Sequence, residues 1–212
     1  MSEWLDADEM IDRYLAEPEQ PRIIDLSGGS PDLVPEWIAW TMDALRSREM
    51  TRSVYLWSDD NLSSDLLVQP SQSNLLREIE RYEGYGRVCC LKGFDKVSFA
   101  FTTGASEEGF ERQLEILKQY SRTSIDLYGY ITLACPLVKD IKGRVQQLLD
   151  RLQAMSPEFV RRIVPLRIEQ FSPMLSRMNV ARSEGLKYQD EVASVWVEEL
   201  SSRSIRPIWT QP

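Results

Sequence analysis

Five short β-like runs, set at regular distances along the chain, constrain its fold more than any other feature. Their starts are roughly 30 to 40 residues apart, about the length of one strand–helix–strand unit. The runs are Arg22–Leu26, Ser53–Ser58, Arg87–Leu91, Ile125–Leu133 and Arg161–Ile168. Apolar residues at helical spacing indicate helices over Leu5–Leu15, Pro35–Ser47, Glu107–Tyr120, Val138–Met155 and Tyr188–Leu200. This alternation predicts an α/β protein with parallel strands and crossover helices.

The predicted strands have one apolar and one more polar face. Successive strand side chains point to opposite faces of a sheet, so Leu56 and Leu91 lie on one face while Trp57, Lys92 and Tyr130 lie on the other. A doubly wound open sheet carries helices on both faces and is apolar on both. We therefore expect a curved sheet with helices outside and a polar concave interior. This is a partial (β/α) barrel of about five parallel strands.

In a barrel the chemistry lies at the carboxyl ends of the strands. Those ends carry Ser27-Gly28-Gly29, Asp59-Asp60-Asn61, Lys92-Gly93, Thr132 and Glu169. The Gly-Gly turn either presents backbone groups to a ligand or is a tight turn that needs positive φ. The acidic segment forms either a pocket rim or a helix-capping loop. The lysine either faces the barrel interior or is a solvated charge.

Chain length and net charge limit the number of domains and the kinds of partner that we expect. The 212 residues fit one domain, in which we expect an N-terminal helix within residues 1–21, barrel units over 22–170, and a C-terminal helix and tail over 171–212. A net charge of -8 argues against nucleic-acid and anionic-membrane partners. No run of about 18 apolar residues predicts a membrane span, and the acidic first residues do not resemble a signal peptide. We expect a cytoplasmic protein.

Residue types that are missing or few exclude several kinds of site. There is no histidine, so a Ser-His-Asp triad, a Cys-His dyad and a histidine-ligated zinc site are impossible within this sequence. Three cysteines form no paired framework and fit a reducing compartment. Cys89 and Cys90 are adjacent on a predicted strand and point to opposite faces, while Cys135 lies in another strand-end loop. They do not converge as the ligands of an iron–sulfur cluster must.

Several segments together resemble the radical S-adenosylmethionine superfamily, in its glycyl-radical-activating-enzyme-like branch. The resemblance covers roughly Ile23 to Glu169. DLSGGSP, beginning at Asp25, is similar to the family's Gly-Gly-Glu-Pro turn, and VYLWSDDN, beginning at Val54, to its third strand and loop. RVCCLKGFD, beginning at Arg87, is similar to the fourth strand and the segment after it. Tyr128–Ile131 and Val164–Leu166 fall where the fifth and sixth strands flank the adenine.

The resemblance implies a partial barrel that binds S-adenosylmethionine beside a [4Fe–4S] cluster. In that family the cluster reduces the sulfonium, and the resulting adenosyl radical abstracts a substrate hydrogen. Backbone groups of the Gly-Gly turn hold the methionyl amino group. The positions that the resemblance assigns to the ligand here are Gly28, Gly29, Ser30, Asp59, Asn61, Lys92, Tyr130 and Pro165.

The sequence departs from the family in two respects. The C-x-x-x-C-x-x-C segment and the first strand before it are not present, and Ser30 stands where the family usually has glutamate. The [4Fe–4S] cluster expected for the family is therefore not supported by these cysteines. We expect no reductive cleavage by this chain alone, which is either truncated or supplied with the missing segment by another chain. Enzyme status stays open.

Two alternatives and one structural consequence follow. In the first alternative, the chain is a cluster-free binding or scaffold subunit that still holds an adenosyl ligand. In the second, it is an α/β nucleotide-binding module unrelated to radical chemistry. Without a first strand, Arg22–Leu26 presents an unpaired sheet edge. We expect this edge to be covered by a second copy of the chain, by a partner strand or by the Leu5–Leu15 helix.

Overall fold

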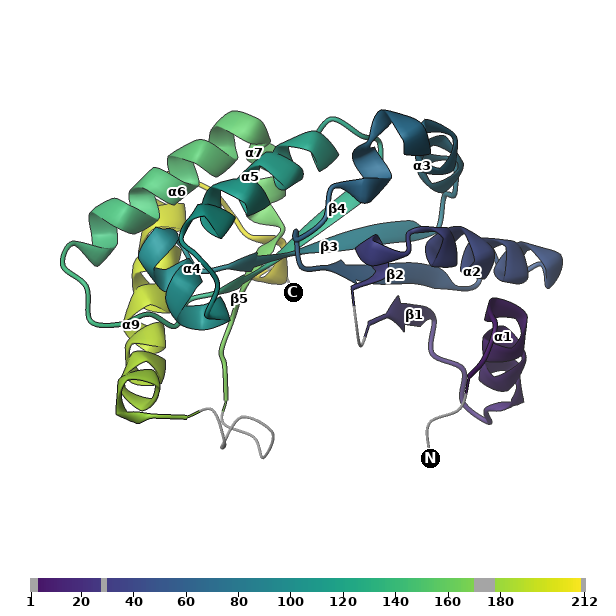
Figure 1. The fold of residues 1–212 in the computed structure, drawn as a ribbon, viewed down its shortest axis with the longest axis horizontal. Helices are drawn as coiled ribbons and strands as arrows, with labels where there is room; N and C mark the ends of the chain where they lie inside the picture. The colour runs from purple at the N-terminus through teal and green to yellow at the C-terminus, as the bar shows by residue number, and fades with distance from the viewer. Residues whose placement is uncertain (1–3, 28–29, 170–177, 211–212) are drawn as a thin grey trace. The chain divides into compact units, whose positions relative to one another are not determined.

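The fold comes from a computed structural model, which describes residues 4–27, 30–169 and 178–210 (Figure 1). Five strands form one all-parallel sheet in the order β1-β2-β3-β4-β5, and helices alternate with them. Ile24 of β1 lies beside Leu56 of β2, and Tyr130 of β4 beside Val164 of β5. The strands are β1 (Ile23–Leu26), β2 (Tyr55–Asp60), β3 (Tyr85–Lys92), β4 (Asp126–Thr132) and β5 (Ile163–Leu166). This topology is that of a partial β/α barrel and confirms the predicted fold class.

The helices occupy the intervals between the strands. They are α1 (Ala7–Ala16), α2 (Glu36–Ser47), α3 (Ser73–Glu80), α4 (Lys96–Thr103), α5 (Glu108–Tyr120), α6 (Ile141–Met155), α7 (Pro157–Arg161) and α9 (Val180–Ser202). Short 3-10 turns are η1 (Pro31–Leu33), η2 (Leu66–Val68), η3 (Pro70–Gln72) and η4 (Ile208–Thr210). The sequence pattern missed α3, α4 and α7, which are too short to establish a period. None of the described helices is both long enough and apolar enough to cross a membrane.

The chain divides into two compact units, and residues of both β3 and β4 are divided between them. Unit 1 comprises Met1–Asp60, Ser64–Val88 and Arg122–Asp126. Unit 2 comprises Asn61–Ser63, Cys89–Ser121 and Leu127–Pro212.

In unit 1, α1 packs on α2 through fully buried apolar residues such as Ile11 and Met42. The guanidinium of Arg48, just after α2, donates to the carboxylates of Asp8 and Asp12 of α1 at 2.7 Å each. Strand β1 lies at the edge of the sheet. It pairs with β2 on one side and has no strand neighbour on the other within the described part of the chain, and its first residue, Ile23, is 52% exposed.

In unit 2, α5 and α6 run side by side (Figure 1), joined by an ion pair of 2.6 Å between Glu111 and Arg151. Helix α9 packs on α6, where Gln146 donates to Glu199 at 3.0 Å. Trp196 of α9 is fully buried and is the largest fully buried side chain of the protein's described residues. The core of this unit therefore lies where its helices meet the sheet.

Burial along the strands agrees only in part with the predicted faces. In β2 the alternation holds, because Leu56, Ser58 and Asp60 are buried while the residues between them are half-buried. In β3 every residue from Tyr85 to Leu91 is buried. Side chains on both faces of β3, the central strand of the sheet, are therefore shielded from solvent up to Leu91, and Lys92 on the predicted polar face is half-buried.

Candidate functional site

A cavity of about 450 Å³ in unit 2 lies at the carboxyl ends of its strands. Lys92 and Thr132, the last residues of β3 and β4, both line it. Arg182 lines it from the first turn of α9, and Phe101 and Leu186 contribute apolar wall. The remaining lining residues are Thr102, Thr103, Ala134, Ile168 and Met178. Its size is that of a small-molecule site, and its place is where parallel α/β sheets bind ligands.

A buried glutamine holds Lys92 in place. The side chain of Gln113, on α5, is 1% exposed and forms two hydrogen bonds with the backbone of Lys92. The Lys92 N–H donates to Gln113 Oε1 at 2.9 Å, and Gln113 Nε2 donates to the Lys92 carbonyl at 3.1 Å. A side-chain amide has the donor and acceptor of a peptide group, so it replaces a strand neighbour where the chain leaves the sheet. The lysine side chain therefore starts from an ordered backbone.

The turn after Lys92 requires glycine. Gly93 has a φ of 74°, and a Cβ at this position would lie 2.4 Å from the backbone nitrogen of Phe99. The Gly93 N–H donates to both the carbonyl and the hydroxyl oxygen of Thr132, each at 3.2 Å. Asp95 then caps α4 by accepting from the N–H of Ser98 at 2.7 Å. The ends of β3 and β4 are thus tied together beside the cavity.

The three threonine hydroxyls of the cavity differ in their hydrogen bonds. Thr102 donates to the carbonyl of Ala134 at 3.2 Å, and Thr103 donates to that of Phe99 at 2.8 Å. The Thr132 hydroxyl accepts from Gly93, and no acceptor for its hydrogen lies within the described residues. A hydroxyl carries one donor and can also accept. Thr132 therefore retains a hydrogen that it can donate to a ligand.

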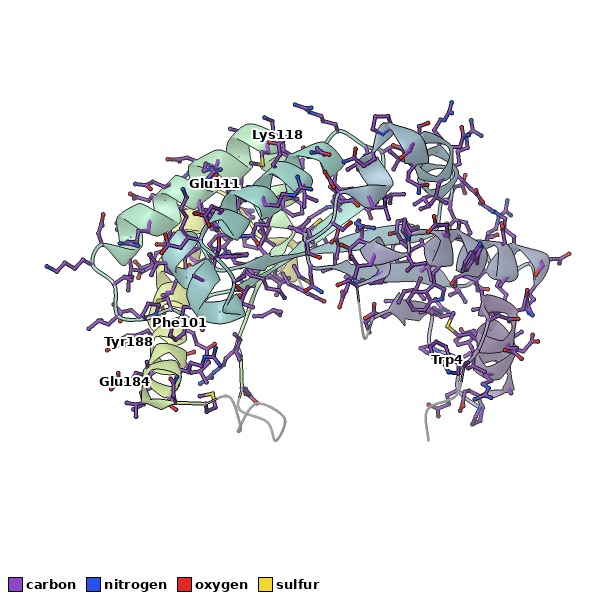
Figure 2. The ribbon with its side chains drawn as sticks, in the orientation of Figure 1. Trp4, Phe101, Glu111, Lys118, Glu184 and Tyr188 are labelled. Atoms are coloured by element: carbon purple, nitrogen blue, oxygen red, sulfur yellow. The ribbon has the colours of Figure 1, made fainter. Side chains whose placement is uncertain are left out.

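The start of α9 forms another wall of the cavity, through Arg182 and Leu186. Gly185 lets α9 approach α4, since a Cβ there would lie 2.3 Å from the ring of Phe101. Figure 2 labels Phe101 near Glu184 and Tyr188 of α9. Further along α9, Gln189 accepts from the N–H of Ile168 at 2.8 Å and donates to its carbonyl at 2.9 Å. This repeats the glutamine clamp of Lys92 and fixes the chain after β5 against the helix that carries Arg182.

The electrostatics of the cavity favour negative charge. Lys92 and Arg182 both line it, and no lining residue is acidic. Lys92 is half-buried, and within residues 4–27, 30–169 and 178–210 no carboxylate forms an ion pair with its ammonium. Two cations beside partly apolar walls attract an anion more strongly than they would in open water. These lining residues favour a ligand with a carboxylate or phosphate group.

Of the six predicted ligand positions that the structure describes, Lys92 alone lines this cavity. Gly28 and Gly29 lie outside the described residues. Ser30 precedes η1 and Asp59 lies in β2, both in unit 1. The other three are in unit 2 but do not line the cavity: Asn61 follows β2, Tyr130 is in β4 and Pro165 is in β5.

Sequence reasoning missed Arg182 altogether. This residue lies on a helix that begins at Val180, although the apolar pattern indicated a start only at Tyr188. The available signal is Asn179, a favourable N-cap whose side chain accepts from the Arg182 N–H at 2.9 Å. Nothing in the spacing of residues connects Arg182 to Lys92, because only folding brings α9 to the end of β3.

The cysteines do not fit an iron–sulfur cluster. All three are buried, and among the residues that the structure describes no three His, Cys, Asp or Glu side chains gather to hold a metal ion. Burial, together with the nearby carboxylates of Asp95 and Glu191, raises the pKa of the Cys135 thiol to about 11. Cluster ligands must be thiolates that converge on one site, so Cys135 has the wrong environment for this role.

Comparison of the sequence with protein-family models and with curated proteins found no match.

Proposed function

We propose that this chain binds a small anionic molecule with an apolar part in the cavity of unit 2. The observation that carries the proposal is that Lys92 and Arg182 line one cavity whose lining contains no acidic residue. The two cations anchor a carboxylate or phosphate, and the hydroxyl of Thr132 donates to the same ligand. Phe101 and Leu186 contact its apolar part. Binding and orientation are the roles that these residues support.

S-adenosylmethionine is the ligand that the family resemblance nominates. Its carboxylate suits Lys92 and Arg182, but its sulfonium and ammonium groups are cations that both side chains repel. S-adenosylhomocysteine has the same adenosine and carboxylate and no sulfonium charge. Adenosine monophosphate carries a phosphate and no cationic amine. Within one set of adenosine compounds, the proposal therefore predicts an order of affinity: adenosine monophosphate first, S-adenosylhomocysteine second and S-adenosylmethionine last.

Isothermal titration calorimetry of the full chain with these three compounds tests the order. The variant Lys92→Gln removes one cation of the cavity, and we expect it to weaken binding of adenosine monophosphate about 10- to 100-fold, the range of one charge-assisted hydrogen bond. The matched control is Lys96→Gln, since Lys96 lies on α4, is exposed and does not line the cavity. Equal affinities of the two variants, or tightest binding of S-adenosylmethionine, would contradict an anion site.

A further inference from the structure

A second cluster of polar groups lies in unit 1, where the sequence predicts an apolar face. Ser58 and Asp60 belong to β2 and share the face of Leu56, while Tyr85 and Arg87 belong to the neighbouring β3. Asp32 of η1 completes the cluster, and η1 packs against β2. No member is more than 5% exposed. Buried charges are rare unless they are paired, so this cluster needs a physical explanation.

Four of the five side chains are hydrogen-bonded to one another. Arg87 donates to Asp60 Oδ2 from Nε at 2.9 Å and from Nη2 at 2.6 Å. Ser58 and Tyr85 share a hydrogen bond of 2.6 Å, and Arg87 Nη1 is 3.4 Å from the Tyr85 hydroxyl. The single cation of the cluster is therefore already committed to Asp60.

Asp32 is the exception. It is 1% exposed, and neither of its carboxylate oxygens has a hydrogen-bond donor in the described part of the protein. Burial, together with the negative charge of Asp60, raises the pKa of Asp32 to about 6, although the nearby Arg87 acts to lower it. With both aspartates ionised, two negative charges face one positive charge away from water. One added proton makes the cluster neutral and gives Asp32 a hydrogen bond to Asp60.

The described residues of β2, η1 and η2 include no further cation. Strand β2 and η2 pack against η1. The further charged residues on or beside these elements are Asp59, whose side chain points to the opposite face of β2, and Asp65, which precedes η2. Asp60 and Arg87 are the charged groups that act on Asp32. A proton is thus the simplest species that can remove the excess negative charge.

We propose that unit 1 contains a buried proton-binding site, in which Asp32 holds one proton and faces the Asp60–Arg87 ion pair, so that the stability of the fold falls as pH rises from mildly acidic to neutral. The direction follows from linkage. The unfolded chain holds this proton only below the ordinary pKa of aspartate, 3.8, whereas the folded chain holds it up to about 6. The bound proton therefore stabilises the fold fully below pH 3.8, progressively less between pH 3.8 and about 6, and not at all above that range.

The variant Asp32→Asn tests the proposal, because an amide is always neutral and can donate to Asp60. Urea unfolding of the full chain at pH 4.5 and 7.5 gives the folding equilibrium constant of each protein. We expect the folding equilibrium constant of the variant, divided by that of the wild type, to rise on the order of 10- to 100-fold from pH 4.5 to pH 7.5. The matched control is Glu83→Gln, which removes an exposed carboxylate of unit 1 and leaves the ratio nearly constant.

A direct measurement keeps the test decisive if the variant does not fold. Carbon-13 NMR of the wild-type carboxyl groups should show one aspartate that titrates about two pH units above the ordinary value. A ratio that does not change with pH, together with an ordinary titration of Asp32, overturns the proposal. So does a wild-type stability that is independent of pH but rises with added Mg²⁺ or Ca²⁺, because the carboxyl pair would then hold a metal ion.

Discussion

The two units use the charged side chains of β3 in opposite ways. In unit 1, Arg87 is fully buried and donates two hydrogen bonds to the carboxylate of Asp60, so its charge is neutralised within the fold. In unit 2, Lys92 ends the same strand, β3, and lines a cavity without an ion pair to any described carboxylate. The difference shows that the accessibility of a charge, rather than its presence on a strand, separates a structural role from a binding role.

The largest expected effect is that of removing Arg87. Arg87→Met leaves Asp60 and Asp32 as two buried carboxyl groups without a counter-ion, and breaking one side of a buried pair costs about 3–5 kcal/mol. Urea unfolding measures this loss. Lys92→Gln is the matched change in unit 2 and should alter the free energy of unfolding by less than about 0.5 kcal/mol while weakening anion binding. If both variants lose equal stability, the contrast between the two units is wrong.

A second prediction sharpens the account of the turn that positions Lys92. Gly93 and Gly104 both have a φ of 74°, but a Cβ at Gly93 meets backbone at 2.4 Å, whereas a Cβ at Gly104 finds its nearest atom, on Arg182, at 4.0 Å. Alanine at either position bears the left-handed backbone penalty of about 1–2 kcal/mol. Only Gly93→Ala adds a clash, so it should be the more destabilising variant and should also weaken binding.

Thermal unfolding of the two glycine variants and calorimetry with adenosine monophosphate provide the measurements. Equal melting temperatures would show that the close approach of Gly93 to Phe99 relaxes without cost.

The smallest effect is expected at the exposed edge of unit 1. The Tyr55 N–H donates to the Arg22 carbonyl at 2.8 Å, so the backbone groups of Ile23 and Asp25 point away from β2 in a parallel pair. Asp25→Pro removes an outward N–H and should cost little stability while reducing any self-association or strand capture. Light scattering over a concentration series compares it with Asp43→Asn, a surface change on α2. An unchanged association state in a self-associating protein would exclude this edge as the contact.

Much of the fold was predictable because it depends on local periodicity. The segment Glu107–Tyr120 has Phe110, Leu114 and Leu117 on one face, and helix α5 begins one residue later than predicted. Strand β2 was displaced, since the pattern ended it at Ser58 while the strand continues to Asp60. Aspartate is unfavourable in strands, so the sequence suggested a loop there, and the ion pair with Arg87 reverses that preference.

The candidate site was predictable only at Lys92, which ends a strand whose limits are visible in the sequence. Its partners depend on long-range packing: Gln113 reaches it from α5, and Arg182 reaches the same cavity from α9. Neither has a local signal for its role. Nothing in the sequence marks Asp32 as buried, and only the packing of η1 against β2 takes it out of solvent.

The sequence by itself determined the alternation of strands and helices, the parallel order and the chemical types that are excluded, because these follow from spacing and composition. The tertiary structure alone decided which charges are buried together and which line a cavity. The reason is physical: the energy of a charge depends on the water and the counter-ions around it, and those are set by segments far away along the chain.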